Sequence, residues 1–220
     1  DSAGTSFLVV HPMDSKDFRV LPGTADAFYP IFSPDGSSLA YIANEKIYTV
    51  RLESGRPIPL TTVSDALGLF WSDDDWIYWA DQQGTAVKRI TPSGNQDPVV
   101  FADDICRCFS VSHGLEYGDV FVTGALGAYH VSANGDVNQT KHIGWNSILM
   151  DSNYLLSVGT GALMAGDVSF KEDGEDVDLG KMVISDVRTS SIGKQAHYSV
   201  SDNGTLIYAR GEQAGLTRLI

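Results

Sequence analysis

Cysteine, basic residues and long apolar runs are all scarce in this 220-residue sequence, and each scarcity excludes a class of protein. Its two cysteines are Cys106 and Cys108. On a strand their side chains share a face, but a disulfide between residues i and i+2 would be strained. Two ligands alone do not make a zinc site either. We therefore interpret both residues as buried or half-buried thiols.

The shortage of positive charge excludes a second group of functions. Lysine and arginine number 15 against 28 aspartates and glutamates, which gives a net charge of −13. Nucleic-acid binding needs basic stripes that displace counterions, and we find none. An acidic surface is repelled by anionic lipid, and no apolar run approaches the roughly 20 residues of a membrane helix. We expect no nucleic-acid partner and no membrane contact by this segment.

Helical patterns and a leader sequence are also lacking. No long segment carries a 3.6-residue apolar period without a glycine or proline interruption. The chain opens on Asp1-Ser2-Ala3-Gly4, without the basic and apolar regions of a signal peptide, so we expect any leader or anchor outside this segment. Glycine, by contrast, is abundant, with 22 residues, and indicates many turns.

What the sequence does contain is a repeat of turn residues between short apolar strands. The first example is Ser33-Pro34-Asp35-Gly36, and later turns end at spacings of 39, 39, 39 and 51 residues. The five turn markers tolerate a left-handed backbone; they are Gly36, Asp75, Gly114, Asn153 and Gly204. A second marker runs in phase at spacings of 39, 41 and 39; its residues are Gly55, Gly94, Gly135 and Gly174. One period therefore reads strand, turn, strand, loop, strand, turn, strand.

Periods near 40 residues with four strands each predict an all-β fold, a β-propeller of about five four-stranded blades. One four-stranded sheet cannot bury both of its faces, and stacking sheets around an axis covers them. We expect residues 1–220 to form a single domain, with its last blade closed by the N- and C-terminal strands because closure removes exposed edges. The alternative is an open arc of a larger propeller. The expected blades are 25–61, 62–101, 102–141, 142–187, and 188–220 with 1–24.

The fourth period is longer than the others because of an acidic stretch, Lys171 to Asp178. We interpret it as a lengthened loop. Its composition resembles that of a calcium loop, but the D-x-[DN]-x-[DN]-G spacing is missing. A solvated loop and a calcium site therefore stay open, and no other cofactor is indicated.

The segment FYPIFSPDGSSLAYIANEKIYTVRLESGRPIPLT, residues 28–61, resembles the TolB-like, WD-type propeller repeat. The order of segments 21–36, 68–80, 162–170 and 198–211 is also similar to propellers in the sensor regions of bacterial serine/threonine kinases. Only the first turn keeps Ser-Pro-Asp-Gly intact. The resemblance implies a non-catalytic binding platform, often extracytoplasmic; similar repeats form TolB, a periplasmic protein-interaction module, and the gating propeller of prolyl oligopeptidase-like enzymes.

Catalytic signatures are missing from the sequence. There is no G-x-S-x-G elbow, no H-E-x-x-H and no kinase motif. The five histidines occupy different phases of the repeat, which argues against a ring of metal ligands. We therefore assign no catalytic and no metal-binding residue.

Two phases of the repeat predict a binding surface. Three aspartates lie ten residues before successive turn markers, and other polar or aromatic residues lie seven or eight before them. In a propeller the innermost strand and the loop before it line the channel and one face. The expected channel-mouth residues are Asp26, Tyr29, Asp65, Asp104, Arg107, Trp145, Asn146 and His197. The aspartates either face a cation or basic group together, or each caps its own loop.

We therefore expect a non-catalytic module that binds a protein or peptide partner, or a small ligand, at the channel mouth. It would be the sensor or interaction part of a larger bacterial signalling protein. The alternatives are the accessory or gating propeller of a prolyl oligopeptidase-like hydrolase, or a propeller hydrolase or lyase using channel carboxylates. The resemblance implies an extracytoplasmic or periplasmic location, and the residues alone do not exclude the cytoplasm.

Overall fold

The structure, a computed structural model, describes most of the chain. The regular elements of the described part are β-strands, which turns and loops connect. None of the described residues forms a helix long and apolar enough to span a membrane. The described residues are 7–10, 19–53, 55–64, 66–81, 86–105, 108–114, 117–124, 127–140, 145–150, 154–158, 162–171, 174–185, 198–200 and 206–208.

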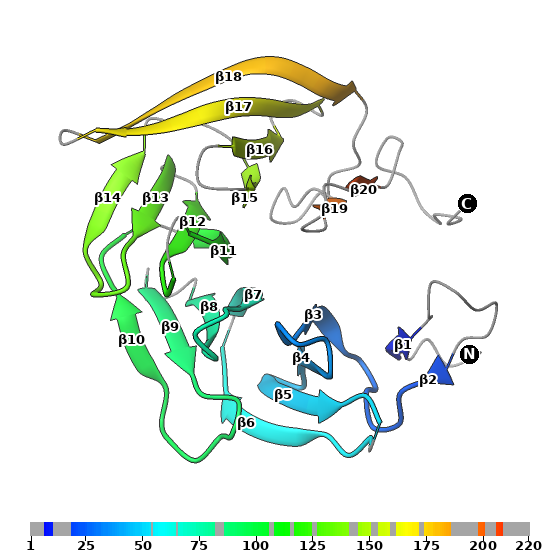
Figure 1. The fold of residues 1–220 in the computed structure, drawn as a ribbon. Coiled ribbons are helices and arrows are strands. Elements are labelled where there is room, and N and C mark those ends of the chain that lie inside the picture. Colours follow the sequence, from blue (N-terminus) through cyan, green and yellow to red (C-terminus); the bar gives the residue numbers. More distant parts are fainter. Residues whose placement is uncertain are drawn as a thin grey trace. The chain divides into compact units, whose positions relative to one another are not determined.

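Four four-stranded antiparallel sheets, here named I to IV, form the body of the fold (Figure 1). Each is made of four consecutive strands that pair in chain order. Sheet I contains β3 (Phe28–Phe32), β4 (Ser38–Ala43), β5 (Lys46–Arg51) and β6 (Ile58–Thr62). Sheet II contains β7 (Ala66–Trp71), β8 (Ile77–Asp81), β9 (Ala86–Ile90) and β10 (Val99–Ala102). Sheet III contains β11 (Cys108–His113), β12 (Val120–Gly124), β13 (Gly127–Val131) and β14 (Val137–Thr140). Sheet IV contains β15 (Trp145–Met150), β16 (Tyr154–Val158), β17 (Ala162–Lys171) and β18 (Gly174–Ser185).

Two further strand pairs lie near the chain ends. In the first, β1 (Val9–Val10) pairs with β2 (Arg19–Val20), and in the second, β19 (Tyr198–Val200) pairs with β20 (Leu206–Tyr208). The chain divides into two compact units, residues 1–103 and 104–220, so each pair belongs to a different unit. Residues 209–220, which the prediction assigns to the last blade, lie outside the described residues. That the two pairs share one blade stays a prediction.

Sheet I is buried on both faces, which explains the almost uninterrupted apolar run of β4. Its odd-numbered residues, Leu39, Tyr41 and Ala43, pack with Leu21 and with partly buried residues of the β1 segment. Its even-numbered residues, Ala40 and Ile42, pack with residues of sheet II. A strand covered on one face would alternate apolar and polar residues, whereas one covered on both faces has to be apolar throughout.

The core between sheets I and II includes buried residues of β4 and β5 from one sheet and of β7 and β8 from the other. Strand β3 contacts β7 there. The large side chains Trp71, Trp79 and Ile77 from sheet II meet Ile42 and Ile47 from sheet I, all of them buried. The expected purpose of the repeat, burial of each sheet by its neighbour, is therefore visible inside the first unit.

The first two turn markers form the turns that the repeat predicts. Gly36 N–H donates to the carbonyl of Ser33 at 2.8 Å, and Asp75 N–H donates to that of Ser72 at 3.0 Å. Both marker residues have a left-handed backbone, with φ of 69° and 61°. At the third marker, Gly114 N–H instead donates to the carbonyl of Asp119 at 3.1 Å across a longer loop. The markers Asn153 and Gly204 lie outside the described residues.

The acidic stretch near Lys171 corrects the expectation of a lengthened loop. Strands β17 and β18 continue as a paired hairpin as far as Lys171 and Gly174. The neighbouring β16 pairs with β17 only up to Asp167, so the hairpin extends beyond the four-stranded part of sheet IV (Figure 1). Strand pairing satisfies the backbone of the added residues, which is why the insertion lengthens two strands.

Candidate functional site

A β-bulge recurs in the first strand of every four-stranded sheet, close to the phase of the predicted channel mouth. The register of pairing shifts between Phe28 and Ile31 in sheet I and between Leu67 and Leu69 in sheet II. It shifts again between Cys108 and Ser110 in sheet III and between Trp145 and Ile148 in sheet IV. Because bulges bend a strand and redirect its side chains, this position differs from a regular strand in all four sheets.

Left-handed backbone explains the residue types at this phase. Asp26 and Asp104, which are equivalent in the repeat, both have φ of 56°. Tyr29 and Gly68, three residues further on in their periods, have φ of 50° and 64°. Aspartate, asparagine and glycine tolerate this conformation well, whereas it strains a tyrosine. The left-handed backbone is therefore one local reason for an aspartate at these two positions, and the choice between a shared ligand and loop capping stays a prediction.

The predicted mouth residues are spread over both units, and the structure describes only some of them. Asp26 and Tyr29 belong to the first unit and Asp104 to the second. Trp145 and Asn146 start strand β15, where the structure describes their backbone. Asp65, Arg107 and His197 lie outside the described residues. That the eight residues form one site stays a prediction.

The side chains at the start of β3 show what this surface offers in sheet I. Asp26 is exposed, and Tyr29 is half-buried and packs against the core between sheets I and II. Phe28 and Phe32, the first and last residues of β3, are 46% and 58% exposed, with the exposed Pro30 between them. This edge of sheet I therefore presents aromatic surface beside a carboxylate.

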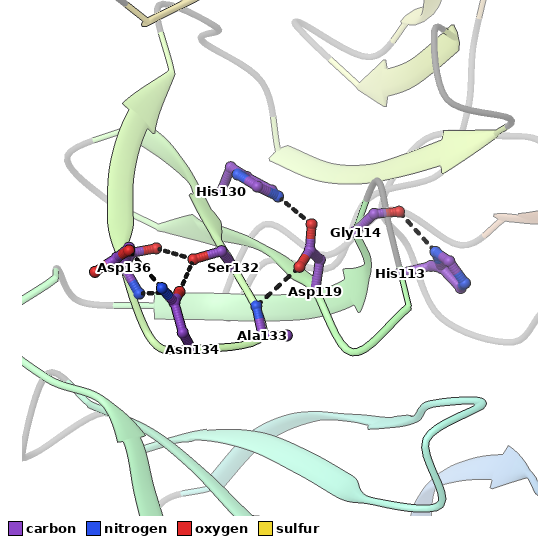
Figure 2. Close-up of polar contacts among 8 residues, drawn as sticks. All are labelled: His113, Gly114, Asp119, His130, Ser132, Ala133, Asn134 and Asp136. Carbon is purple, nitrogen blue, oxygen red and sulfur yellow. Dashed lines mark hydrogen bonds and ion pairs between the residues drawn. The ribbon is translucent and has the colours of Figure 1, made fainter. Parts of the chain in front are cut away.

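Sheet III contains a polar cluster that the sequence did not reveal (Figure 2). His130 Nε2 lies 2.8 Å from Asp119 Oδ2, and both side chains are buried. The other carboxylate oxygen of Asp119 accepts the Ala133 N–H at 2.8 Å. Nearby, His113 Nδ1 lies 2.6 Å from the Gly114 carbonyl oxygen. The repeat gave no sign of this pair because Asp119 and His130 meet only through the pairing of β12 with β13.

The buried pair lies between two turns of one sheet. Asp119 immediately precedes β12, and Ala133 belongs to the turn after β13. Among the residues that the structure describes, no three His, Cys, Asp or Glu side chains gather where they could hold a metal ion. The contact holds strand β13 and the turn after it to the residue before β12.

Comparison with solved structures decides the architecture. Streptogramin B lyase aligns with a TM-score of 0.56 at 12% identity, over 84% of this chain and 68% of that one. TolB from Acinetobacter baumannii aligns with a TM-score of 0.59 at 16% identity, over 90% of this chain and 55% of that one. The fold is a β-propeller. The expected fold class is thus confirmed, with sheets I to IV as blades.

Other comparisons add a partial family match. Residues 3–87 match the model described as "Dipeptidyl peptidase IV (DPP IV) N-terminal region". Virginiamycin B lyase from Staphylococcus aureus is a further propeller of similar structure, with a TM-score of 0.54 at 12% identity over 94% of this chain and 74% of that one. No curated protein sequence matches the chain. The likeness to TolB agrees with the repeat resemblance, while the likeness to kinase sensors stays a prediction.

Proposed function

We propose that this propeller is a non-catalytic module that binds a protein or peptide partner, or a small ligand, at the blade ends where the first strands begin. The observation that carries the proposal is the surface at the start of β3. There, Phe28 opens the strand with 46% of its surface exposed, and the exposed Asp26 lies just before it. Aromatic side chains beside a charge are typical of recognition surfaces, because they give large contact area at low entropy cost.

The repeat supports extending this surface to other blades. The same bulged phase carries Asp104 before sheet III and Trp145 in sheet IV. Acidic side chains next to aromatic ones favour a ligand with a basic group and an apolar part. The resemblance to TolB-like repeats, which implies a protein-interaction module, agrees with this reading.

A peptide selection with the isolated chain tests the proposal. A random peptide library is selected against the wild type, and the affinity of each recovered peptide is measured for Asp26→Asn and Phe28→Ala. The matched control is Ile58→Ala, because Ile58 is 56% exposed but lies on β6, the opposite edge strand of sheet I. We expect each of the two mouth variants to weaken binding about tenfold, which is the typical size of a binding hot spot above 1 kcal/mol, and the control to bind as the wild type does.

Peptides that ignore both mouth variants, or that lose affinity equally for Ile58→Ala, would contradict the proposed surface. Turnover by the isolated chain would contradict the non-catalytic role. Lyase and lactone substrates belong in that screen, because several solved propellers of similar structure are named as lyases or as a gluconolactonase.

A second candidate function is favoured by the family match over residues 3–87. We propose as the alternative that the chain is the accessory or gating propeller of a prolyl oligopeptidase-like hydrolase. The parent open reading frame tests this directly: a G-x-S-x-G elbow with its partner aspartate and histidine beyond residue 220 would support it. A kinase or another unrelated domain there would instead support the sensor role.

The signalling role and the location belong to the proposal as well. A bacterial sensor propeller outside the cytoplasm is implied by the repeat resemblance. Fractionation of cells that express the full-length parent protein, with a protease-accessibility assay on intact spheroplasts, would place the propeller on one side of the membrane.

A further inference from the structure

A cluster around Arg89 lies on one face of sheet II, away from the proposed mouth. Arg89 is on β9, which lies between β8 and β10 in the sheet. Its guanidinium carbon is 4.5 Å from the centre of the Trp76 ring and 4.6 Å from that of Phe101. Trp76 directly precedes β8 and Phe101 is on β10, so aromatic rings flank the cation from both neighbouring strands. Such contacts hold a guanidinium in place without neutralising it.

The carboxylate of Asp74 joins this cluster through Tyr78. Asp74 Oδ2 accepts the Tyr78 hydroxyl at 2.9 Å, and Asp74 Oδ1 accepts the Trp76 N–H at 3.3 Å. The Tyr78 oxygen in turn accepts Arg89 Nη1 at 3.2 Å. Burial raises the pKa of Tyr78 well above its usual range, so its hydroxyl keeps the proton that it donates to Asp74. A neutral phenol therefore separates the cation from the anion.

Arg89 keeps unused hydrogen-bonding capacity. A guanidinium has five N–H donors, and the one hydrogen bond found for Arg89 within the described part of the chain goes to Tyr78. Its Nε is buried and has no acceptor there. By contrast, the neighbouring Lys88 pairs with Asp81 at 2.5 Å. A buried atom is out of a ligand's reach, so an incoming acceptor would meet the terminal Nη groups of this half-buried side chain.

We propose that Arg89 anchors a carboxylate-binding site, with Trp76 and Phe101 as its walls. The planar fork of a guanidinium matches a planar carboxylate through two parallel hydrogen bonds, and rings on both sides favour approach in its plane. The ligand is the side chain of an aspartate or glutamate, or the C-terminal carboxylate, of a partner protein. This site goes beyond the proposed function: the β7–β8 turn that carries Asp74 is at the strand ends opposite to the start of β7.

A titration with matched small ligands tests the site. The probes are N-acetylglycinate, which carries a carboxylate, its neutral amide N-acetylglycinamide, and inorganic phosphate. The readouts are the NMR signals of the Arg89 Nε–H and of the Trp76 indole N–H in the intact chain. We expect both signals to shift saturably with a millimolar dissociation constant for N-acetylglycinate, and at least fivefold weaker binding of the amide.

Three variants separate the site from general charge effects. Arg89→Gln should abolish the Trp76 shift. Arg89→Lys keeps the charge but loses the fork, so its affinity should fall at least fivefold, and circular dichroism checks that both variants fold. Arg51→Gln removes an exposed arginine of sheet I and should titrate as the wild type does.

The proposal is overturned by any of three kinds of result. One is the absence of a saturable shift in the folded wild type. Another is equal binding of the amide, or an equal loss in Arg51→Gln. The third is phosphate binding tenfold more tightly than the carboxylate, which would assign the cluster to tetrahedral anions.

Discussion

The buried pair of Asp119 and His130 ties the turn before β12 to strand β13, and its removal should be felt at the scale of one residue. Replacing Asp119 with alanine leaves His130 and the Ala133 N–H without their acceptor. Breaking a buried pair in this way typically costs about 3 kcal/mol. We expect Asp119→Ala to lower the free energy of unfolding by roughly that amount, measured by urea denaturation.

Asp136, in the turn after β13, offers the matched control for this experiment. Asp136 is exposed and hydrogen-bonds mainly within its own turn, to Asn134 (Figure 2). Asp136→Ala should change the free energy of unfolding by about 0.5 kcal/mol or less. Equal effects of the two substitutions would show that the buried pair adds nothing beyond an ordinary surface turn.

Single residues were also where the sequence was least informative. The repeat phase located Asp26 and Asp104, but it could not tell that both occupy left-handed backbone, a conformation that aspartate tolerates. Tyr29 was expected at the mouth, and its side chain packs against the core between two sheets. A bulge can place a side chain on either face of the sheet, so the repeat phase does not fix where Tyr29 points. A glycine inside a strand pattern, such as Gly68, is a sequence signal for a bulge.

At the scale of the element, the turn between β3 and β4 is stabilised by one carboxylate. Asp35 Oδ1 accepts the Ser33 hydroxyl at 2.6 Å and the Ser37 N–H at 3.0 Å. The Ser33 hydroxyl, followed by the Ser37 groups, lowers the pKa of Asp35 from 3.8 to about 2. A carboxyl group with a lowered folded-state pKa stabilises the fold above its unfolded pKa and loses that effect as the pH falls.

We therefore expect a pH-dependent difference between wild type and Asp35→Ala. The urea midpoint of the variant should be lower than that of the wild type above pH 3.8, and the gap should close as the pH falls through about 2. Asp103→Asn, which removes one exposed carboxylate outside this turn, controls for the change in net charge. A gap that stays constant down to pH 2 would mean that Asp35 acts through its shape alone.

Elements were predicted well where local chemistry determines them. Four-strand periods with turns at Gly36 and Asp75 follow from turn residues between β-branched and aromatic runs, and the structure confirms them. The stretch after Val168 was misread because its acidic residues suit a solvated loop. Their pairing across β17 and β18 depends on partners from the other strand, which a loop-like composition does not reveal.

At the scale of the whole molecule, burial of each blade by its neighbours is the property that the repeat encodes. The two-sided core of sheet I, with sheet II on one face and the β1 segment on the other, shows why a single blade would not be stable alone. A blade at the chain end needs the same cover. This need is the physical reason to predict that β1 and β2 complete a blade with β19 and β20.

Spin labels distinguish this closure from an open arc. With Cys106 and Cys108 replaced by serine, labels are placed at Val9 on β1 and Ile207 on β20, and the distance between them is measured by pulsed electron resonance. Neighbouring strands lie about 4.8 Å apart, so a shared blade requires a distance set mainly by the label linkers.

The control pair is Val9 and Val20, which are direct partners across β1 and β2 and are both exposed. If the test pair reads as short as the control pair, β20 lies beside β1, as a shared terminal blade requires. If it reads several strand widths longer while the control stays short, the chain is an arc whose end strands must be covered by further blades or by a partner.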